Sequence, residues 1–352
     1  MPRIAVLPGD GIGVDVTRET VKVLETLRDA FHTDLHLEHF DFSAERYLRD
    51  GTTLPEDAFV RFRDEFDAIF AGAFGDPRVP DMAHARDILL GLRFRLDLYV
   101  NLRPVRVYHD RLTPLRNKSA RDIDIVIFRE NTEGLYCGSG GFLKKGTADE
   151  VAINEDINTR KGVERILRAA FEHARKRRRK RLCMTDKSNV LRFAHDLWQR
   201  TFALVRAEYA DVESSHMFVD ALAMQLVLRP EQFDVIVGCN MFGDIVSDLG
   251  AAIAGGLGLA ASGNIHPGRV SLFEPVHGSA PKYAGKDRAN PLAAILSAAL
   301  MLEHVGLDRE ATAVDQAVQE VISAGHVTVD LGGSLGTAAV GDHVCRALRD
   351  KA

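Results

Sequence analysis

Residues 233–248, FDVIVGCNMFGDIVSD, hold the change of pattern that decides the fold class. They open on a short β-branched and aromatic run, which is typical of a buried strand. After Gly238 the apolar residues Met241, Ile245 and Leu249 recur at every fourth position, which predicts a helix. A strand that leads directly into a helix is typical of an α/β protein.

The predicted helix also carries two carboxylates. Asp244 and Asp248 are four residues apart, so they lie one turn apart on one face. Such a pair repels unless a cation or solvent separates the two groups, and its oxygen ligands suit Mg²⁺ or Mn²⁺. A solvated acidic face is the commoner explanation of an isolated pair. Residues elsewhere in the chain must therefore decide between the two interpretations.

Composition indicates a soluble globular protein. The chain has 352 residues, 46% of them hydrophobic and 27% charged, which leaves room for two domains and a large core. A net charge of -5 gives no reason to expect nucleic acid or an anionic membrane as a partner. No apolar run reaches the roughly 18 residues that span a bilayer, and the N-terminal residues do not resemble a signal peptide. The four cysteines are scattered, so we expect buried, reduced thiols and a cytoplasmic location.

Strand and helix patterns alternate along the chain. Strand-like runs occur at 3–7, 35–40, 66–71, 98–107, 123–128, 182–185 and 212–218, and helical patterns at 15–30, 160–180, 190–209, 291–303, 309–324 and 335–349. This alternation predicts an α/β fold with a mainly parallel sheet. Residues 137–155 predict a hairpin arm that is too thin to fold alone and packs on a partner subunit. No linker divides the chain, so a second domain must be inserted within the first.

The run 175–181, RKRRRKR, has two possible interpretations. One is a nucleic-acid-binding patch, and the other is a helix end where cations offset the helix dipole. The run has no interleaved aromatic residues and the chain is acidic overall, so we favour the helix end.

Several charged residues near predicted strand ends are candidates for chemistry. Arg93, Arg103 and Arg129 are each either surface residues or forks for a carboxylate. Next to an Asp pair, they suggest a carboxylate-bearing substrate bound beside a metal. Tyr136 and Lys187 are candidate proton donors or acceptors, although an interface tyrosine and a solvated lysine explain them as well.

Two further features leave alternatives open. Asp220 either N-caps the helix that follows it or acts as a third metal ligand. The loop 273–291 is rich in small residues, which allow a phosphate-bearing ligand to approach the backbone, and His277 lies within it. The loop 9–13, GDGIG, follows a strand but is not GxGxxG, so a simple tight turn explains it at least as well.

Taken together, these motifs resemble the β-decarboxylating dehydrogenases, the isocitrate and isopropylmalate dehydrogenase family. The resemblance runs from PGDGIG to DLGGSLGT and includes NLRP, RENTEGLY, DKSNV, FVDALAM, GDIVSD and EPVHGSAP. It implies an isopropylmalate dehydrogenase-like two-domain α/β fold, with a mainly parallel sheet flanked by helices, that is not a Rossmann fold. Residues 1–98 and 255–352 would form a large cofactor-binding domain. Residues 99–254 would form an inserted small domain with substrate, metal and dimer-interface residues, including the arm 137–155.

The resemblance also implies a homodimer with shared active sites and a role for each candidate. Arg93, Arg103 and Arg129 would clamp the carboxylates of a 2-hydroxy acid, and Tyr136 would be the acid that protonates the enolate. Lys187 of the partner subunit would be the base for the hydroxyl. Mg²⁺ or Mn²⁺ would be held by Asp244, Asp248 and the partner's Asp220. NAD or NADP would lie on Glu274, His277, Gly278, Ser279, Ala280, Lys282, Tyr283 and Asn290.

The segment before Arg93 indicates the substrate. Leu89 and Leu90 match the leucine pair that packs on the isopropyl group of isopropylmalate, and burying that group is worth ~2 kcal/mol. Isocitrate enzymes have Ser and Asn where this chain has Asp87 and Leu89, and homoisocitrate enzymes have Arg in place of Leu90. The form RENTEG is shared with D-malate and tartrate enzymes. We therefore expect conversion of 3-isopropylmalate to 2-oxoisocaproate, with D-malate-type substrates as the nearest alternative and isocitrate or homoisocitrate behind them.

The choice of nicotinamide and the catalytic competence of the chain have alternatives too. Lys282 and Tyr283 resemble the pair that meets the 2′-phosphate in NADP-dependent isocitrate dehydrogenases. The Tyr and Arg that complete that site are Val329 and Gly333 here, so use of both cofactors is expected. A silent regulatory subunit is the non-enzyme alternative. Such subunits usually lose a catalytic Tyr, Lys or metal Asp, and none is missing.

Overall fold

The computed structural model describes residues 1–352, which form two compact units. The first comprises residues 1–98, 106–121 and 251–352, and the second residues 99–105 and 122–250. We expected the inserted part to run unbroken from 99 to 254, but 106–121 returns to the first unit. Arg106 and Tyr108 bond to Asp315 at 2.7 and 2.8 Å, and Arg111 bonds to the Ile322 carbonyl at 2.6 Å. These contacts tie the segment to α11 (Asp308–Ser323).

The first unit contains five strands in the order β2-β1-β3-β12-β11. Their bounds are His36–His39, Arg3–Leu7, Ala68–Ala71, Ser271–Pro275 and Ala261–Ile265. The neighbours are parallel except for β11 and β12, which are antiparallel. Side chains of β1 alternate between two cores, because Ile4 and Val6 face one cluster and Ala5 and Leu7 the other. The strand is thus buried on both faces, which is why its sequence is a continuous apolar run.

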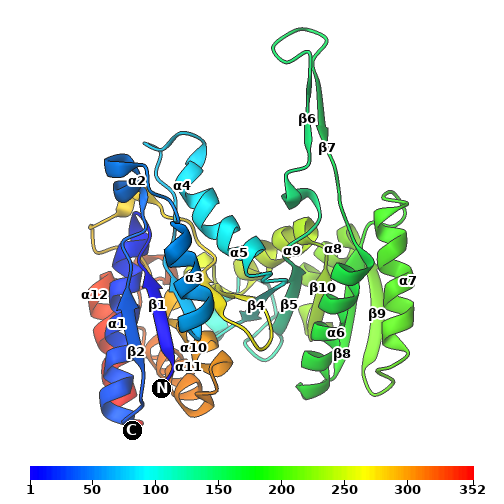
Figure 1. Cartoon of the computed structure of the whole chain (residues 1–352). Coiled ribbons are helices and arrows are strands. Elements are labelled where there is room, and N and C mark those ends of the chain that lie inside the picture. Colours follow the sequence, from blue (N-terminus) through cyan, green and yellow to red (C-terminus); the bar gives the residue numbers. More distant parts are fainter. The chain divides into compact units, whose positions relative to one another are not determined.

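Helices cover both faces of these strands (Figure 1). One core is formed with α1 (Ile12–Phe31), α10 (Leu292–His304), α11 and α12 (Thr337–Arg349). The other is formed with α3 (Glu56–Glu65) and α5 (Gly91–Arg95). The two remaining helices of this unit are α2 (Ala44–Asp50) and α4 (Ala83–Ala85).

Five strands of the second unit are neighbours in the order β4-β5-β10-β8-β9, and its other two strands form a separate hairpin. The bounds of the five neighbours are Val100–Arg106, Asp124–Glu130, Val235–Gly238, Arg181–Asp186 and Glu213–Phe218. β10 is parallel to β5 and β8, and β8 is parallel to β9. The helices are α6 (Arg160–Lys176), α7 (Ala194–Arg206), α8 (Val219–Leu228) and α9 (Asn240–Ile253). The strand and helix predicted within 233–248 are confirmed, and so is the mainly parallel α/β fold.

The predicted hairpin is also confirmed. β6 (Gly140–Leu143) and β7 (Val151–Asn154) pair only with each other, with Leu143 opposite Val151. Phe142, Leu143, Val151 and Ile153 are 45–59% exposed. The hairpin extends away from the rest of its unit (Figure 1). Its packing on a partner remains a prediction.

The basic run 175–181 continues past the end of α6 and binds local acceptors. Arg175 bonds to Asp211 at 3.1 Å, and Arg177 bonds to Asp234. Arg177 and Arg179 also donate to the Asp124 carbonyl at 2.9 and 2.5 Å. The run therefore ties the end of α6 to the starts of neighbouring strands.

The structure also bears on two expectations from composition, which concern membrane-spanning helices and the burial of the cysteines. None of the helices combines the length and apolar composition that crossing a bilayer requires. Cys183, Cys239 and Cys345 are buried free thiols, but Cys137 is exposed, so the expectation that all four are buried is wrong. Cys137 ends a 3₁₀ turn, Leu135–Cys137, which precedes the hairpin.

We predict an acid-sensitive contribution to stability from His173 of α6. Burial, reinforced by Arg177, lowers the pKa of this side chain from 6.5 to about 4. The unfolded chain therefore binds the proton at a higher pH than the folded protein does. The free energy of unfolding falls as the pH drops from 6.5 to about 4, by up to roughly 3 kcal/mol. Urea unfolding at several pH values measures this, and His173→Leu should flatten the dependence. An equal pH dependence in both proteins contradicts the prediction.

Candidate active site

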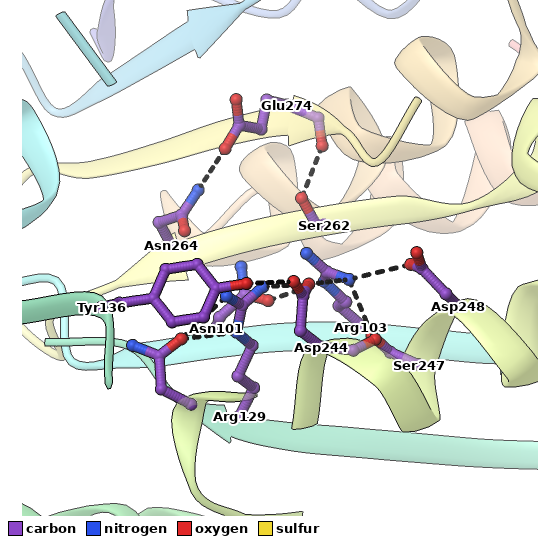
Figure 2. Close-up of polar contacts among 11 residues, drawn as sticks. Asn101, Arg103, Arg129, Tyr136, Asp244, Ser247, Asp248, Ser262, Asn264 and Glu274 are labelled. Atoms are coloured by element: carbon purple, nitrogen blue, oxygen red, sulfur yellow. Dashed lines mark hydrogen bonds and ion pairs between the residues drawn. The ribbon is translucent and has the colours of Figure 1, made fainter. Parts of the chain in front are cut away.

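Asp244 is the centre of a polar cluster in the second unit (Figure 2). It lies in the first turns of α9, directly after β10. Its Oδ1 is bound by the guanidinium of Arg129 and by that of Arg103 at 3.1 Å. Its Oδ2 accepts a hydrogen bond from the Tyr136 hydroxyl at 2.6 Å. Four of the residues singled out in the sequence thus meet at one carboxylate.

Arg103, on β4, is held by two further side chains that the sequence analysis missed. Its Nε donates to Asn101 at 2.7 Å, and its Nη1 donates to Ser247 at 2.7 Å and to Asp248 at 3.4 Å. Asn101 is part of the NLRP motif and Ser247 of the GDIVSD motif, so both were within quoted segments. Each orients the guanidinium toward α9 (Figure 2).

Arg129, at the end of β5, is 3% exposed and is positioned by Asn240. Its Nε and Nη2 donate to Asn240 Oδ1 at 3.0 and 2.7 Å. The guanidinium also lies 4.9 Å from the centre of the Tyr136 ring, within reach of a cation–π interaction. Gly243 lies against the start of the Arg129 side chain, because an added Cβ there would be 2.7 Å from the Arg129 Cβ. Only glycine leaves this arginine in place.

The two aspartates of α9 fit one end of a metal site. Partial burial raises the pKa of Asp248, and Asp244 adds to this effect, against the opposing charge of Arg103. A cation between the two carboxylates would relieve this cost, and carboxylate oxygens are the donors that Mg²⁺ and Mn²⁺ prefer. No group of three or more His, Cys, Asp or Glu side chains is placed to hold a metal. The chain thus supplies two carboxylates, and the remaining ligands would come from substrate, water or a second subunit.

Lys187 and Asp220 form a separate pair in the same unit. Lys187 follows β8, and its Nζ lies 2.6 Å from Asp220 Oδ1. This hydrogen bond is the main cause of a lowered pKa of Asp220. Of the two alternatives for Asp220, the N-cap of α8 is wrong, because Phe218 is the N-cap and no side chain caps the helix, and the role of metal ligand remains a prediction. Within one chain, Asp220 does not join Asp244 and Asp248.

The loop RENTEG has a structural role that accounts for its second Glu. The Glu133 carboxylate accepts from the Thr159 backbone at 2.8 Å and from its hydroxyl at 2.5 Å, and Thr159 is the N-cap of α6. The Glu133 carbonyl in turn accepts from Asn240 Nδ2 at 3.0 Å. Glu133 thereby fixes the loop that carries Tyr136.

The predicted substrate-binding residues Leu89, Leu90 and Arg93 lie on one helical segment. Arg86–Leu90 is a π-helical turn between α4 and α5. Ile88 and Leu92 of this segment are fully buried in the core. Three neighbours, Leu89, Leu90 and Arg93, are only partly buried, so part of each side chain is accessible to a ligand.

The predicted cofactor residues of the first unit lie in and beside the loop between β12 and α10. The Glu274 carboxylate accepts from Asn264 at 2.9 Å, and its carbonyl accepts from Ser262 at 2.7 Å (Figure 2). Asn290 accepts from the Leu292 backbone at 3.0 Å and donates to Asp330 at 3.0 Å.

The middle of this loop is also ordered by local contacts. Burial lowers the pKa of His277, whose Nδ1 lies 3.1 Å from the Gly278 carbonyl. The Ser279 carbonyl accepts from the Ile12 backbone of the GDGIG loop at 2.7 Å. Ala280 has a positive φ of 35°, and it is followed by a 3₁₀ turn, Pro281–Tyr283, that contains Lys282.

Comparison with known proteins gives the family. A sequence model of isocitrate/isopropylmalate dehydrogenases matches residues 3–344. The chain is 46% identical to the 3-isopropylmalate dehydrogenase of Thermobifida fusca, over 99% of this chain and 98% of that protein. It is 49% identical to that of Corynebacterium jeikeium, over 99% of this chain and 100% of that protein.

Two solved structures that resemble this chain support the same family. An isocitrate dehydrogenase from Methylococcus capsulatus has a TM-score of 0.88 at 37% identity and covers 99% of this chain and 100% of its own. The TT0538 protein of Thermus thermophilus also has a TM-score of 0.88 at 37% identity, over 98% of this chain and 68% of its own. The chain belongs to the isocitrate/isopropylmalate dehydrogenase family, and the predicted family and fold are confirmed.

Gly243 provides a test of the cluster. We predict that Gly243→Ala displaces Arg129. The kcat/KM of the dehydrogenase reaction should then fall by roughly 10–100-fold, the usual cost of misplacing a side chain by about an ångström. Circular dichroism should show that the fold is retained. Unchanged kcat/KM in a folded variant would show that the position of Arg129 does not matter.

Proposed function

We propose that the protein catalyses the oxidative decarboxylation of 3-isopropylmalate to 2-oxoisocaproate, with NAD or NADP and a divalent cation. The single observation that carries the proposal is the meeting of Arg103, Arg129 and Tyr136 at Asp244. The relatives from T. fusca and C. jeikeium, which bear the name 3-isopropylmalate dehydrogenase, support it.

The arginines are suited to a dicarboxylate. Arg103 and Arg129 already engage a carboxylate, that of Asp244, and a malate-type substrate offers the same chemical group. Arg93 of the first unit is the proposed third member of the clamp. Such a clamp would orient the C2–H bond for hydride loss, the C2 hydroxyl for proton loss and the C3 carboxylate for departure as CO₂.

Two side chains have the proton chemistry that the reaction requires. A divalent cation bound at Asp244 and Asp248 would supply the Lewis acidity that favours an ionised C2 oxygen. Bound NAD or NADP would supply the hydride acceptor. Lys187 Nζ would take the proton from the C2 hydroxyl, and the Tyr136 hydroxyl would deliver a proton to C3 after CO₂ leaves.

A second copy of the chain completes the proposed site. Lys187 and Asp220 pair with each other rather than with the Asp244 cluster. The exposed apolar hairpin β6–β7 offers a surface that association would bury. We therefore propose a homodimer in which the partner's Lys187 and the partner's Asp220 serve the Asp244 site.

Leu89 and Leu90 favour isopropylmalate over the other family substrates. Both are partly exposed leucines beside Arg93, and together they offer an apolar surface for the isopropyl group. D-malate and tartrate enzymes share the RENTEG form, but Glu133 has a structural role in this loop that does not depend on the substrate. Isopropylmalate therefore remains the preferred substrate, with D-malate second.

Use of both nicotinamides is proposed from the cofactor loop. Lys282 and Arg288 both lie near the Tyr283 ring, at 4.9 and 5.9 Å from its centre, and offer cations for a 2′-phosphate. Val329 offers no such donor. At Gly333 an added Cβ would overlap the Val327 carbonyl, so this backbone cannot carry an arginine there. The cations present could bind the 2′-phosphate of NADP, and the donors that are missing would leave NAD able to bind as well.

The decisive experiment follows reduced nicotinamide by absorbance in the presence of Mn²⁺. Isopropylmalate, D-malate, tartrate, isocitrate and homoisocitrate are each tested with NAD and with NADP. We expect isopropylmalate to have the highest kcat/KM, and chelation by EDTA to abolish turnover. Turnover of isocitrate alone would overturn the role given to Leu89 and Leu90, and no turnover of any substrate would favour a silent regulatory subunit.

Subunit complementation tests the shared site. Tyr136→Phe and Lys187→Met chains should each be inactive, but mixed dimers should contain one site with both native residues. In a random equal mixture half of the dimers are mixed, so we predict recovery of about a quarter of the wild-type activity. The matched control mixes Tyr136→Phe with Asp244→Asn, which lie on the same side of the proposed site and should not complement. Absence of recovery in the first mixture would show that each chain has its own complete site.

A further inference from the structure

A buried His–Asp pair in the first unit has no role in the reaction described above. His84 Nε2 lies 2.7 Å from Asp10 Oδ2, and the two side chains are 0% and 4% exposed. Asp10 belongs to the GDGIG loop, and His84 belongs to α4, which leads into the segment that carries Leu89 and Leu90.

Asp10 is fixed independently of His84. Its Oδ1 accepts from the Ala44 backbone at 2.6 Å, and its Oδ2 accepts from the Gly75 backbone at 2.8 Å. Its own backbone N–H donates to the Ala73 carbonyl at 2.7 Å. The aspartate is thus anchored by three separate backbone contacts, and His84 is the partner whose place it determines.

His84 is the polar member of an otherwise apolar stripe. His84, Ile88, Leu92 and Leu96 recur at every fourth position and are 0–6% exposed. The last three pack in the core, where aliphatic contacts are non-directional. A buried hydrogen bond is different, because it is lost outside a narrow geometry and the buried groups are then left unpaired.

The imidazole of His84 therefore fixes the position of residues 84–96. Nε2 lies within hydrogen-bond distance of Asp10, whereas the buried Nδ1 has no hydrogen-bond partner, so the contact with Asp10 is the one that holds the ring. Just beyond His84, the π-helical turn Arg86–Leu90 presents Leu89 and Leu90 away from the stripe. Single π-helical turns are rare and are frequently found at functional sites.

We propose that His84 is a positioning residue whose hydrogen bond to Asp10 sets the place of Leu89 and Leu90, and thereby the preference for a branched substituent at C3. The proposal rests on the proposed function, since it assigns these leucines to the substrate side chain. The GDGIG loop, through Asp10, would then fix the position of the turn Arg86–Leu90, which carries the two leucines.

The test compares two substrates that differ only at C3. Isopropylmalate needs the leucine pair, whereas D-malate carries hydrogen in place of the isopropyl group. His84→Met removes the donor and keeps a flexible apolar side chain in the core. We expect kcat/KM for isopropylmalate to fall by roughly 10–100-fold and kcat/KM for D-malate to change much less. The KM for the nicotinamide should not change, because the contact between Ile12 and Ser279 does not involve His84.

Two further variants separate positioning from general damage. His84→Gln retains a donor near the place of Nε2 and should restore the ratio of the two kcat/KM values. Leu90→Ala should lower the same ratio directly. If His84→Met is insoluble, His84→Asn, whose shorter amide cannot reach Asp10, answers the same question.

The outcomes are distinct. Equal losses for both substrates, or no loss, would overturn the positioning role of His84. Wild-type protein that turns over neither substrate would overturn the proposed function instead.

Discussion

The carboxylate of Asp244 is the contact on which the rest of the site depends. It neutralises two arginines, one of them almost completely buried, and it orders a tyrosine. A buried guanidinium without a counter-charge would cost several kcal/mol. The turn from β10 to α9 is therefore more than a connection, because it delivers the anion that makes Arg103 and Arg129 tolerable where they are. A substrate carboxylate or a cation that enters the site would have to exchange with these existing bonds.

Much of the fold, and the family, could be predicted from local sequence patterns. The strand and helix within 233–248 and the hairpin 137–155 follow from side-chain periodicity, and the motifs around them indicated the family. The positions of the arginine partners could not be predicted in this way. Arg129 and Asn240 are 111 residues apart in sequence, so only the pairing of β5 with β10 brings them together.

Two places where the structure departs from local sequence signals have the same physical origin. Asp is among the preferred residues at helix N-termini, yet Asp220 lies inside the first turn of α8 and binds Lys187, 33 residues earlier. The segment 106–121 looked like part of an unbroken insertion, but its arginines and Tyr108 find acceptors on α11, about 200 residues further along the chain. In each case a tertiary partner outweighed the local signal.

We propose above that Asp244 and Asp248 hold a divalent cation. Titration of the protein with Mn²⁺, followed by electron paramagnetic resonance in the presence of isopropylmalate, tests it most directly. We expect wild-type protein to bind one Mn²⁺ tightly per proposed site, and Asp244→Asn and Asp248→Asn each to abolish tight binding while the fold is retained. Undiminished Mn²⁺ binding in both folded variants would contradict it.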